Sequence, residues 1–513
     1  MDRGRGREPA GNSRRVDRNL VEVKLNSQSR RPTRVKLPSF VVVGVCLISL
    51  VMFAAGRDTS ANLQQEAPTP PLPQLCAACV RGNLDYLAGP ALRGRGSGTI
   101  DEYHAAQFIA RKLAQYGLAP AAGKGRYIQV ATVRSRKVTA APVLSFHTGE
   151  SPEHAVTWTH GNEMAVLRVS QPDVSGPLQN LDATDGNTPP ADVKEGAVVL
   201  LRLKLGTSTQ DVGKVVQRYM QSKAAIIVVP EPSDGKSQFE QLSSGMPRAA
   251  TKSGDDASGP NVVFASTDAA NQLWMAPDGT MVKWHAEVTP WKTSHTWNVL
   301  AKIEGTAQKE KIILLSAHLD HLGVRHGKTY PGADDDASGT VAVMELARVL
   351  AKEPRPKRSL VFALWGSEEV GLVGAKYFLE HPAFDLQDIV ANLEFEMIAR
   401  PDPELQHDQL WLTGWERSDL GPALAQHGAK LTGDPHPDQN FFARSDNYAL
   451  AKDGIVAQTV SSYGLHKDYH RPTDTLEKVD WQHLDAVIAS MIGPVTWLAN
   501  SDFTPQWKEG MNP

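Results

Sequence analysis

The sequence is poor in cysteine and has almost no excess of charge of either sign. Only three cysteines occur in 513 residues. Cys76 and Cys79 form a single C-x-x-C, and no second pair completes a four-cysteine zinc site. The two are either a small disulfide loop or two free thiols. Lys and Arg total 54 against 57 Asp and Glu. This balance argues against a strongly basic nucleic-acid binder, so we expect no nucleic-acid partner.

Charge is also missing from one apolar stretch near the amino end, residues 39–55. Its length lies between a signal-peptide core and the roughly 20 residues of a membrane-spanning helix. Residues 1–38 before it are rich in Arg and are predicted to be a disordered cytoplasmic tail. We expect residues 39–56 to be an uncleaved membrane anchor, with cleavage near Ala54 to Gly56 as the alternative. The remainder would then be periplasmic or extracellular, anchored or secreted.

The length of the chain suggests two or three structural units. Residues 57–74 are rich in proline and are predicted to be a stiff linker. Residues 75–139 are predicted to open the main domain. They include a helix from about Ile100, whose apolar stripe consists of Ala105, Phe108, Ile109 and Leu113. Arg93 and Arg95 in the preceding glycine-rich loop are interpreted as solvated loop charges, with ligand binding as the alternative.

Residues 140–292 have a different pattern, with short strands separated by Gly, Pro, Asp and Ser clusters. This pattern predicts a separate inserted unit. Its clearest elements are a strand within residues 195–205, a helix near 212–222, a strand within 224–232 and an apolar segment at 262–266. Together they resemble the protease-associated domain. The resemblance implies a small β-rich unit that covers or flanks a peptidase site.

Residues 293–505 alternate between strand and helix patterns. Strands are predicted at residues 297–305, 311–317, 359–365 and 391–397, with later ones at 410–414 and 454–460. A helix is predicted after Gly339, with Ser338 as its N-cap. The alternation is typical of a doubly wound, mostly parallel sheet with helices on both faces. In such sheets ligands bind at the carboxyl ends of the strands.

Acidic and imidazole side chains gather where these strands end. The residues that draw attention are His318, Asp320, Asp334, Glu368, Glu369, Glu396 and His470. Histidine nitrogen and carboxylate oxygen suit Zn²⁺, and two ions about 3.5 to 4 Å apart share a carboxylate readily. The adjacent carboxylates of Glu368 and Glu369 can divide two tasks: one neutralises a metal ion, and the other accepts a proton from metal-bound water.

These motifs, in this order, resemble the M28 family of zinc exopeptidases over about residues 297–500. The resemblance implies a zinc exopeptidase fold and two Zn²⁺ ions that share one aspartate. Glu368 would be the general base, and Asp320 would orient the imidazole of His318. A cis peptide bond is implied after the bridging aspartate, between Asp334 and Asp335. The implied metal ligands are His318, Asp334 as the bridge, Glu369, Glu396 and His470.

Glu396 departs from the family pattern, which usually has aspartate there. Glu394, two residues earlier on the same strand face, is therefore a second candidate. The resemblance also implies supporting positions at His321, Ser445 and Asp446, which would orient the ligands. His326 and His466 are interpreted as loop histidines.

The expected activity is that of a membrane-anchored aminopeptidase acting on peptides outside the cytoplasm. One alternative is a carboxypeptidase for acidic peptides, because Arg444 and Lys467 near the motifs would suit a carboxylate. Others are a single-zinc glutaminyl cyclase, and a receptor or scaffold that keeps the fold without catalysis.

Overall fold

The computed structural model describes residues 74–149, 155–183, 192–204, 206–220, 222–231, 236–243, 245–249, 252–253, 259–325 and 327–513. The predicted tail, the predicted anchor at residues 39–56 and His326 lie outside these ranges. So does the predicted linker, except for Gln74. Among the described helices, none combines the length and apolar character needed to cross a bilayer.

The described residues form a large sheet that carries the strand-end motifs. Its strands, in spatial order, are β10 (Lys252–Ser253), β2 (Ile128–Ser135), β13 (Lys292–Ile303), β17 (Arg358–Trp365), β14 (Gln308–His318), β18 (Ile389–Phe395), β21 (Ala457–Ser461), β19 (Leu410–Leu412) and β20 (Leu431–Gly433), while β1 (Ala119–Pro120) pairs with β13. All the strands predicted after residue 293 are present.

The prediction of a mostly parallel sheet is wrong, because this sheet is mixed. Its centre is parallel: β14 pairs in parallel with β17 and β18, and β18 with β21. On one side, however, β13 is antiparallel to both β17 and β2. Only residues 304–307 join β13 to β14. A parallel crossover needs about a dozen residues, so this short connection makes the chain reverse its direction.

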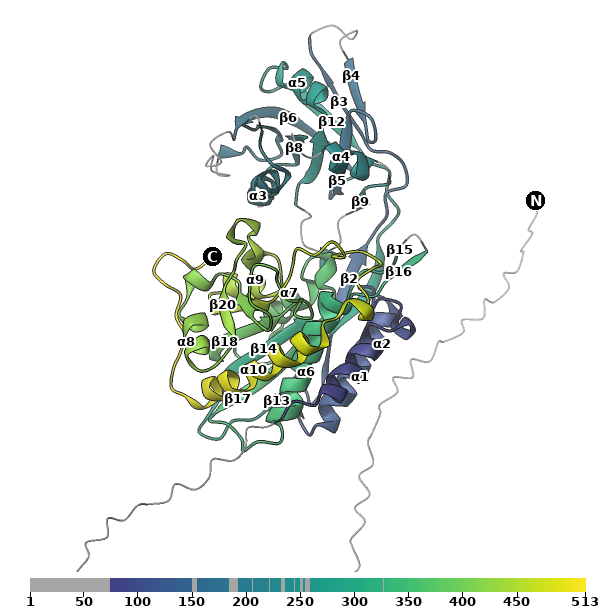
Figure 1. The fold of residues 1–513 in the computed structure, drawn as a ribbon. Coiled ribbons are helices and arrows are strands. Elements are labelled where there is room, and N and C mark those ends of the chain that lie inside the picture. The colour runs from purple at the N-terminus through teal and green to yellow at the C-terminus, as the bar shows by residue number, and fades with distance from the viewer. Residues whose placement is uncertain are drawn as a thin grey trace, which may run out of the picture. The chain divides into compact units, whose positions relative to one another are not determined.

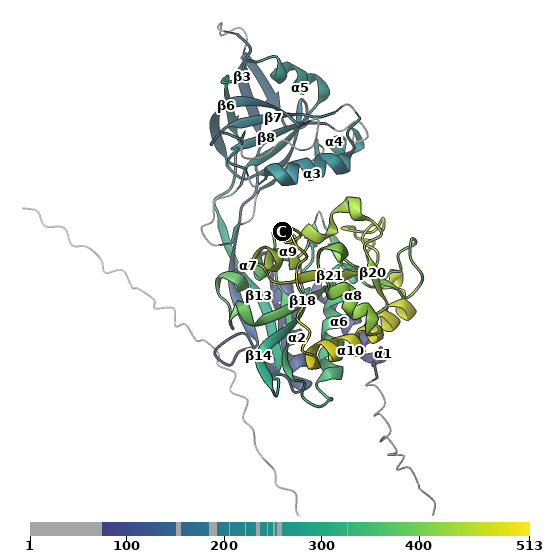
Figure 2. The same cartoon turned by 90° about the vertical axis from the view of Figure 1, so that its left-hand side faces the viewer.

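Helices cover both faces of the sheet, as predicted. α1 (Ala77–Leu87), α2 (Ile100–Gln115), α6 (Gly339–Leu350), α8 (Leu420–Gln426) and α10 (Trp481–Asn500) pack on one face, and α7 (Val373–Glu380) and α9 (Asn447–Lys452) pack on the other (Figures 1 and 2). Side chains alternate along the strands between the two cores: Ile313 and Leu315 point to the first, and Ile312 and Leu314 to the second. Both faces of the parallel centre are therefore buried.

A second sheet is formed by the strands between residues 143 and 285, apart from β10. Their spatial order is β4 (Ala155–Thr159), β3 (Val143–His147), β12 (Met281–His285), β6 (Asp173–Asp182), β7 (Val198–Arg202), β8 (Ile226–Pro230), β11 (Asn261–Ala265), β5 (Met164–Val169) and β9 (Arg248–Ala249). The helices of this segment are α3 (Thr209–Tyr219), α4 (Lys236–Ser243) and α5 (Thr267–Trp274). The predicted strand, helix and second strand are confirmed as β7, α3 and β8, and the predicted apolar segment at 262–266 overlaps the strand β11. A short hairpin, β15 (Gly323–Arg325) with β16 (Lys328–Tyr330), stands apart from both sheets.

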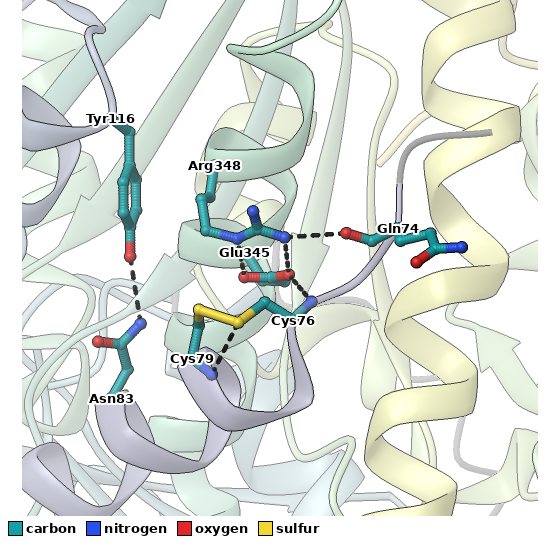
Figure 3. The surroundings of a disulfide bond; sticks show 7 residues. All are labelled: Gln74, Cys76, Cys79, Asn83, Tyr116, Glu345 and Arg348. Carbon is teal, nitrogen blue, oxygen red and sulfur yellow. Dashed lines mark hydrogen bonds and ion pairs between the residues drawn. A yellow bond between two sulfur atoms is a disulfide. The ribbon is translucent and has the colours of Figure 1, made fainter. Parts of the chain in front are cut away.

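Cys76 and Cys79 form a disulfide at the start of α1. The backbone N–H of Cys76 donates to Glu345 Oε1 of α6 at 2.6 Å. Arg348 binds the same carboxylate and donates to the carbonyl of Gln74 at 3.0 Å (Figure 3). The disulfide alternative is therefore the one the structure contains. The disulfide turn is attached to α6, the helix that follows the acidic loop.

The predicted apolar stripe of α2 is confirmed. Ala105, Ile109 and Leu113 are fully buried, and Phe108 packs against the same core. The interpretation of Arg95 as a solvated loop charge is wrong, because its side chain is completely buried. Its guanidinium donates to backbone carbonyls instead of to water. Arg93, in contrast, is exposed and pairs with Asp101 at 2.9 Å.

Candidate metal centre

The carboxyl ends of the central parallel strands bring the acidic and imidazole side chains to one edge of the sheet. β14 ends at His318, β17 ends three residues before Glu368, and β18 ends one residue before Glu396. His470 comes from the loop after β21. Because these strands run in the same direction, four segments that are distant in sequence converge at one place.

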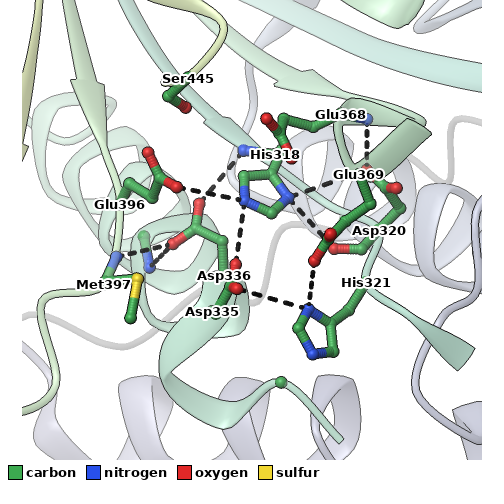
Figure 4. A network of polar contacts seen from close by, with 12 residues as sticks. His318, Asp320, His321, Asp335, Asp336, Glu368, Glu369, Glu396, Met397 and Ser445 are labelled. Atoms are coloured by element: carbon green, nitrogen blue, oxygen red, sulfur yellow. Dashed lines mark hydrogen bonds and ion pairs between the residues drawn. The ribbon is translucent and has the colours of Figure 1, made fainter. Parts of the chain in front are cut away.

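Asp335 lies at the centre of this cluster (Figure 4). Its Oδ1 is 3.3 Å from His318 Nε2, and its Oδ2 is 3.2 Å from His470 Nε2. Each histidine also has a glutamate partner. His318 Nε2 lies 3.9 Å from Glu396 Oε1, and His470 Nε2 lies 3.2 Å from Glu369 Oε2. One carboxylate thus faces two histidine–glutamate pairs, one with each oxygen.

The structure does not place Asp334 between the two pairs, contrary to our expectation. Asp334 Oδ1 accepts the backbone N–H of Ala399 at 2.7 Å, and its Oδ2 lies 3.0 Å from His466 Nε2. The carboxylate of Asp336 is also held by hydrogen bonds to the backbone. It accepts backbone N–H bonds from His318, Gly339 and Met397. Of the three consecutive aspartates, only Asp335 is left to face the histidines.

The cis peptide bond is likewise one residue later than expected. It joins Asp335 to Asp336, not Asp334 to Asp335. Ser338 also behaves differently from its predicted role as an N-cap, since its side chain makes no cap bond to α6. Its hydroxyl donates instead to the carbonyl of Asp334 at 2.7 Å and accepts the N–H of Ile398 at 3.0 Å. Ser338 thus helps to fix the acidic loop.

The cluster is strongly polarised. Burial and the charge of Asp335 would raise the pKa of Glu369, but His321 and His470 lower it to about 2. Burial would lower the pKa of His470, but hydrogen bonds to Asp335 and Glu369 raise it to about 9. The carboxylate of Glu369 is therefore held ionised by the neighbouring positive charge of the histidines. A divalent cation would supply that charge in place of protonated histidines.

The donor set fits zinc. Several buried atoms of candidate ligands make no well-oriented hydrogen bond, although other candidate ligands lie within 2.7 to 3.3 Å of them. They include His318 Nε2, Asp335 Oδ2 and Glu369 Oε1. Buried polar atoms are rarely left unpaired unless they serve another purpose. Ligand atoms around a tetrahedral zinc ion lie about 3.3 Å apart. The separations of 3.2 to 3.3 Å among Asp335, His318, His470 and Glu369 match that value.

Asp320 and Glu368 are linked through the backbone. Asp320 Oδ1 accepts the N–H of Glu368 at 2.9 Å, and Oδ2 accepts the hydroxyl of Ser97 at 2.5 Å. The imidazole of His318 is 3.2 Å from the backbone carbonyl of Asp320 but 3.8 Å from its carboxylate. The carboxylate of Asp320 therefore positions Glu368 more directly than it positions His318. Burial raises the pKa of Glu368 well above its usual range, with further contributions from Asp446 and Glu369.

Glu396 rather than Glu394 reaches the cluster. Glu396 lies within ligand distance of His318 and Asp335, whereas Glu394 Oε1 is held behind it by the hydroxyl of Ser445 at 3.4 Å. The longer side chain of glutamate therefore still reaches from the end of β18. Asp446 is also completely buried, and burial raises its pKa to about 8.

Two histidines have contacts that the sequence reasoning assigned incompletely or missed. His321 Nδ1 lies 2.7 Å from Glu369 Oε1, which places it against a candidate ligand as the expected supporting position requires. His466, interpreted as a loop histidine, is buried and holds Asp334. The signal would have been its spacing of four residues before His470, in the same loop.

A small pocket opens beside Glu396. Its walls include Met397, Trp411 and Phe441, with the hydroxyls of Thr413 and Thr459. The guanidinium of Arg444 also lines it and lies 4.9 Å from the ring centre of Phe441. A pocket lined by three aromatic side chains and one cation thus adjoins the metal centre.

A third cluster of potential ligands, His407, Asp408 and His483, lies outside this centre. His407 Nε2 is 3.0 Å from Asp480 Oδ2, and its Nδ1 is 2.6 Å from Asp408 Oδ1. The ammonium of Lys430 is 3.8 Å from Asp408 Oδ2. His407 and Lys430 supply these carboxylates with ion pairs, and we assign no metal to this cluster.

His483 gives this cluster a testable pH dependence. Burial, together with the charge of His407, lowers its pKa from 6.5 to about 4. Below pH 6.5 the unfolded chain therefore takes up a proton that the folded protein accepts only near pH 4. Stability is lost over that window, by up to about 3 kcal/mol.

We expect H483N to lack this pH-dependent loss of stability, because asparagine does not titrate. Its side chain still offers an acceptor for the backbone N–H of Asp408. Urea unfolding of the metal-free wild type and variant at pH 7 and pH 4.5 measures the effect. The wild type should lose more stability than H483N between pH 7 and pH 4.5. The difference in unfolding free energy between the two proteins should therefore be smaller at pH 4.5 than at pH 7. An unchanged difference would contradict the assignment.

Comparison with known proteins supports the interpretation of this centre. Residues 298–493 match the model of peptidase family M28. The probable lipoprotein aminopeptidase LpqL of Mycobacterium tuberculosis is 30% identical over 249 residues, which cover 43% of this chain and 48% of that protein. The probable leucine aminopeptidase 2 of Aspergillus oryzae is 31% identical over 169 residues, which cover 31% and 32% of the two chains. The chain thus spans about half, or less, of the length of these relatives.

Two further comparisons concern the metal and the fold. A probable zinc metalloprotease of Leptosphaeria maculans is 41% identical over 83 residues, 16% of this chain and 19% of that protein. Among solved structures, the aminopeptidase from Aneurinibacillus sp. strain AM-1 has a TM-score of 0.54 at 21% identity, and the match covers 84% of this chain and 96% of that chain. This second likeness shows a shared fold. Residues 298–493, which carry the strand-end motifs, are thus the part of the chain that matches peptidase family M28.

Proposed function

We propose that this chain is a two-zinc exopeptidase that removes residues from the amino end of peptides. The observation that carries the proposal is the position of Asp335, whose two carboxylate oxygens face separate histidine–glutamate pairs. In this proposal His318 and Glu396 hold one ion, and Glu369 and His470 hold the other. Asp335 bridges them, in place of Asp334.

Zinc bound there would polarise the scissile carbonyl and acidify the attacking water. Glu368 would accept a proton from that water and return it to the leaving amine. Two features support this role for Glu368. Within the described part of the chain its carboxylate forms no hydrogen bond or ion pair, whereas its backbone N–H is fixed by Asp320. Burial also favours its protonated form, which suits a group that must hold and release a proton.

Arg444 supports a second candidate, a carboxypeptidase for acidic peptides. Its guanidinium lines the cavity beside Glu396 and would suit a substrate carboxylate. An aminopeptidase needs a free α-amine on its substrate, whereas a carboxypeptidase needs a free α-carboxylate. The two activities therefore respond oppositely to capping of the peptide ends.

We expect C-amidated peptides with a free amino end to be cleaved and N-acetylated peptides to be resistant. Mass spectrometry of digests of a peptide library should show stepwise loss from the amino end, and a chelator should stop it. Cleavage of the N-acetylated set, with loss from the carboxyl end, would establish the carboxypeptidase instead. A chain that contains no zinc and cleaves neither set would favour the receptor or scaffold.

We also propose that the catalytic part lies outside the cytoplasm, held by residues 39–56 or released after cleavage there. The disulfide between Cys76 and Cys79 supports this, since disulfides persist mainly in oxidising compartments. We further propose that residues 140–292 form a protease-associated domain. The parallel run of β7, β8 and β11, with α3 between the first two, is the arrangement on which that proposal rests.

A further inference from the structure

We propose that Arg95 is a positioning residue that holds the two metal-binding loops in a fixed relation and thereby sets the affinity for zinc. This inference rests on the proposed function, because it concerns the same centre. Arg95 lies outside the segment that matches the family model, which begins at residue 298. A residue from the amino-terminal part of the chain would therefore help to position the metal ligands.

The side chain of Arg95 is completely buried and donates to four backbone carbonyls. Its Nε donates to Leu319 at 2.9 Å, and its Nη2 donates to Gly332 at 3.0 Å. Its Nη1 donates to both Pro331 and Leu87 at 2.7 Å. A guanidinium offers five N–H donors in a rigid plane, and here that plane is used to join separate segments of backbone.

Three of the four accepting carbonyls lie close in sequence to the proposed ligands. Leu319 follows His318, and Pro331 and Gly332 lead into the loop that carries Asp335. One side chain thus joins the loop of the first histidine to the loop of the bridging carboxylate. The separation between His318 Nε2 and Asp335 Oδ1 depends on how these two loops lie relative to each other (Figure 4).

The backbone around Arg95 strengthens the same connection. The N–H of His321 donates to the carbonyl of Arg95 at 3.1 Å, and the N–H of Gly323 donates to that of Gly94 at 3.0 Å. The hydroxyl of Ser97 binds Asp320 Oδ2. Gly94 leaves no room for a side chain, since a Cβ there would lie 2.1 Å from the carbonyl oxygen of Tyr330. Residues 94–97 therefore lie as a clip across the His318 loop.

Charge explains why an arginine, and not a neutral donor, occupies this place. Burial lowers the pKa of Arg95, whereas Asp320, Asp336, Asp335 and Asp474 raise it. Arginine stays protonated in proteins, so its charge opposes the mutual repulsion of these carboxylates. It does so without binding any of them directly, which leaves Asp335 free to face the histidines.

The test compares R95K and R95M with the same two substitutions at Arg93, two residues away in the same loop. Lysine keeps the charge but cannot reproduce the planar set of donors. For R95K we expect a 10- to 100-fold rise in the zinc dissociation constant, the range typical of residues that support metal ligands. R95M, which loses the charge as well, should bind zinc more weakly still. R93K and R93M should stay within twofold of wild type, because Arg93 is exposed.

Zinc affinity is measured by competition with a chromogenic chelator, and circular dichroism confirms the fold of each metal-free variant. Wild-type zinc affinity in R95K would overturn the inference. So would an R95K protein that stays unfolded with and without zinc, since Arg95 would then be needed for the fold alone. If wild type cleaves no peptide while R95K still weakens zinc binding, the proposed function fails and this inference stands. If wild type cleaves peptides while R95K binds zinc as tightly as wild type, the proposed function stands and this inference fails.

Discussion

Replacing Glu368 with glutamine should nearly abolish peptide hydrolysis while both zinc ions remain bound. Glutamine has the same size but accepts no proton at neutral pH, so the attacking water loses its base. General bases contribute about 10²- to 10⁴-fold to turnover, and we expect kcat to fall by that amount with little change in KM. Stopped assays on a C-amidated peptide give kcat, and elemental analysis gives zinc per chain.

The neighbouring substitution E369Q is the matched contrast, because it removes one carboxylate at the next position of the same loop. Glu369 lies 3.2 Å from His470 Nε2 through Oε2, so E369Q should lower zinc content as well as activity. Full activity in E368Q would remove Glu368 from the mechanism. Loss of zinc in E368Q would instead make it a ligand and exchange the proposed roles of the two glutamates.

The second large effect is expected at Asp335. D335N should lose zinc from both positions, because each oxygen of this carboxylate faces one of the two ligand pairs. We expect a fall from two ions per chain toward none and an apparent zinc affinity that is weaker by well over the roughly 100-fold seen for outer residues. Chelator competition and elemental analysis measure both quantities.

D334N, one residue away, is the control and should keep both ions. Its side-chain oxygen still accepts the N–H of Ala399, but His466 and Arg400 lose a negative partner. Removing one member of a buried ion pair costs roughly 3 kcal/mol, so the expected change is in thermal stability. If D334N loses zinc and D335N keeps it, the bridging role returns to Asp334.

The contrast between Asp334 and Asp335 shows where sequence reasoning reaches its limit. Three consecutive aspartates look alike in the sequence, and the chemistry asks for one of them. The choice depends on which carboxylates are already occupied by N–H groups from elsewhere. The backbone N–H of Ala399 donates to the carboxylate of Asp334, and that of Met397 donates to the carboxylate of Asp336. Both donors come from the segment after β18, about sixty residues further on, and no local pattern encodes that contact.

Other features were accessible from the sequence because they depend on local periodicity. The strand that ends at His318, the burial of the α2 stripe and the placing of Glu368 after β17 all follow from apolar patterns and strand ends. The mixed character of the sheet was not accessible in the same way. A strand pattern carries no direction, and only the short connection after Ile303 hints that β13 is reversed.

The clip formed by residues 94–97 also has a consequence for biosynthesis. Arg95 and its partner Leu319 are 224 residues apart in sequence. At the usual rate of about 5 to 20 residues per second, Arg95 would leave the ribosome about 10 to 45 s before that partner. During this interval the two metal-binding loops have not been synthesised, so the guanidinium lacks the acceptors that they provide. Assembly of the centre is therefore a late event, and a fragment limited to residues 298–493 would lack the clip altogether.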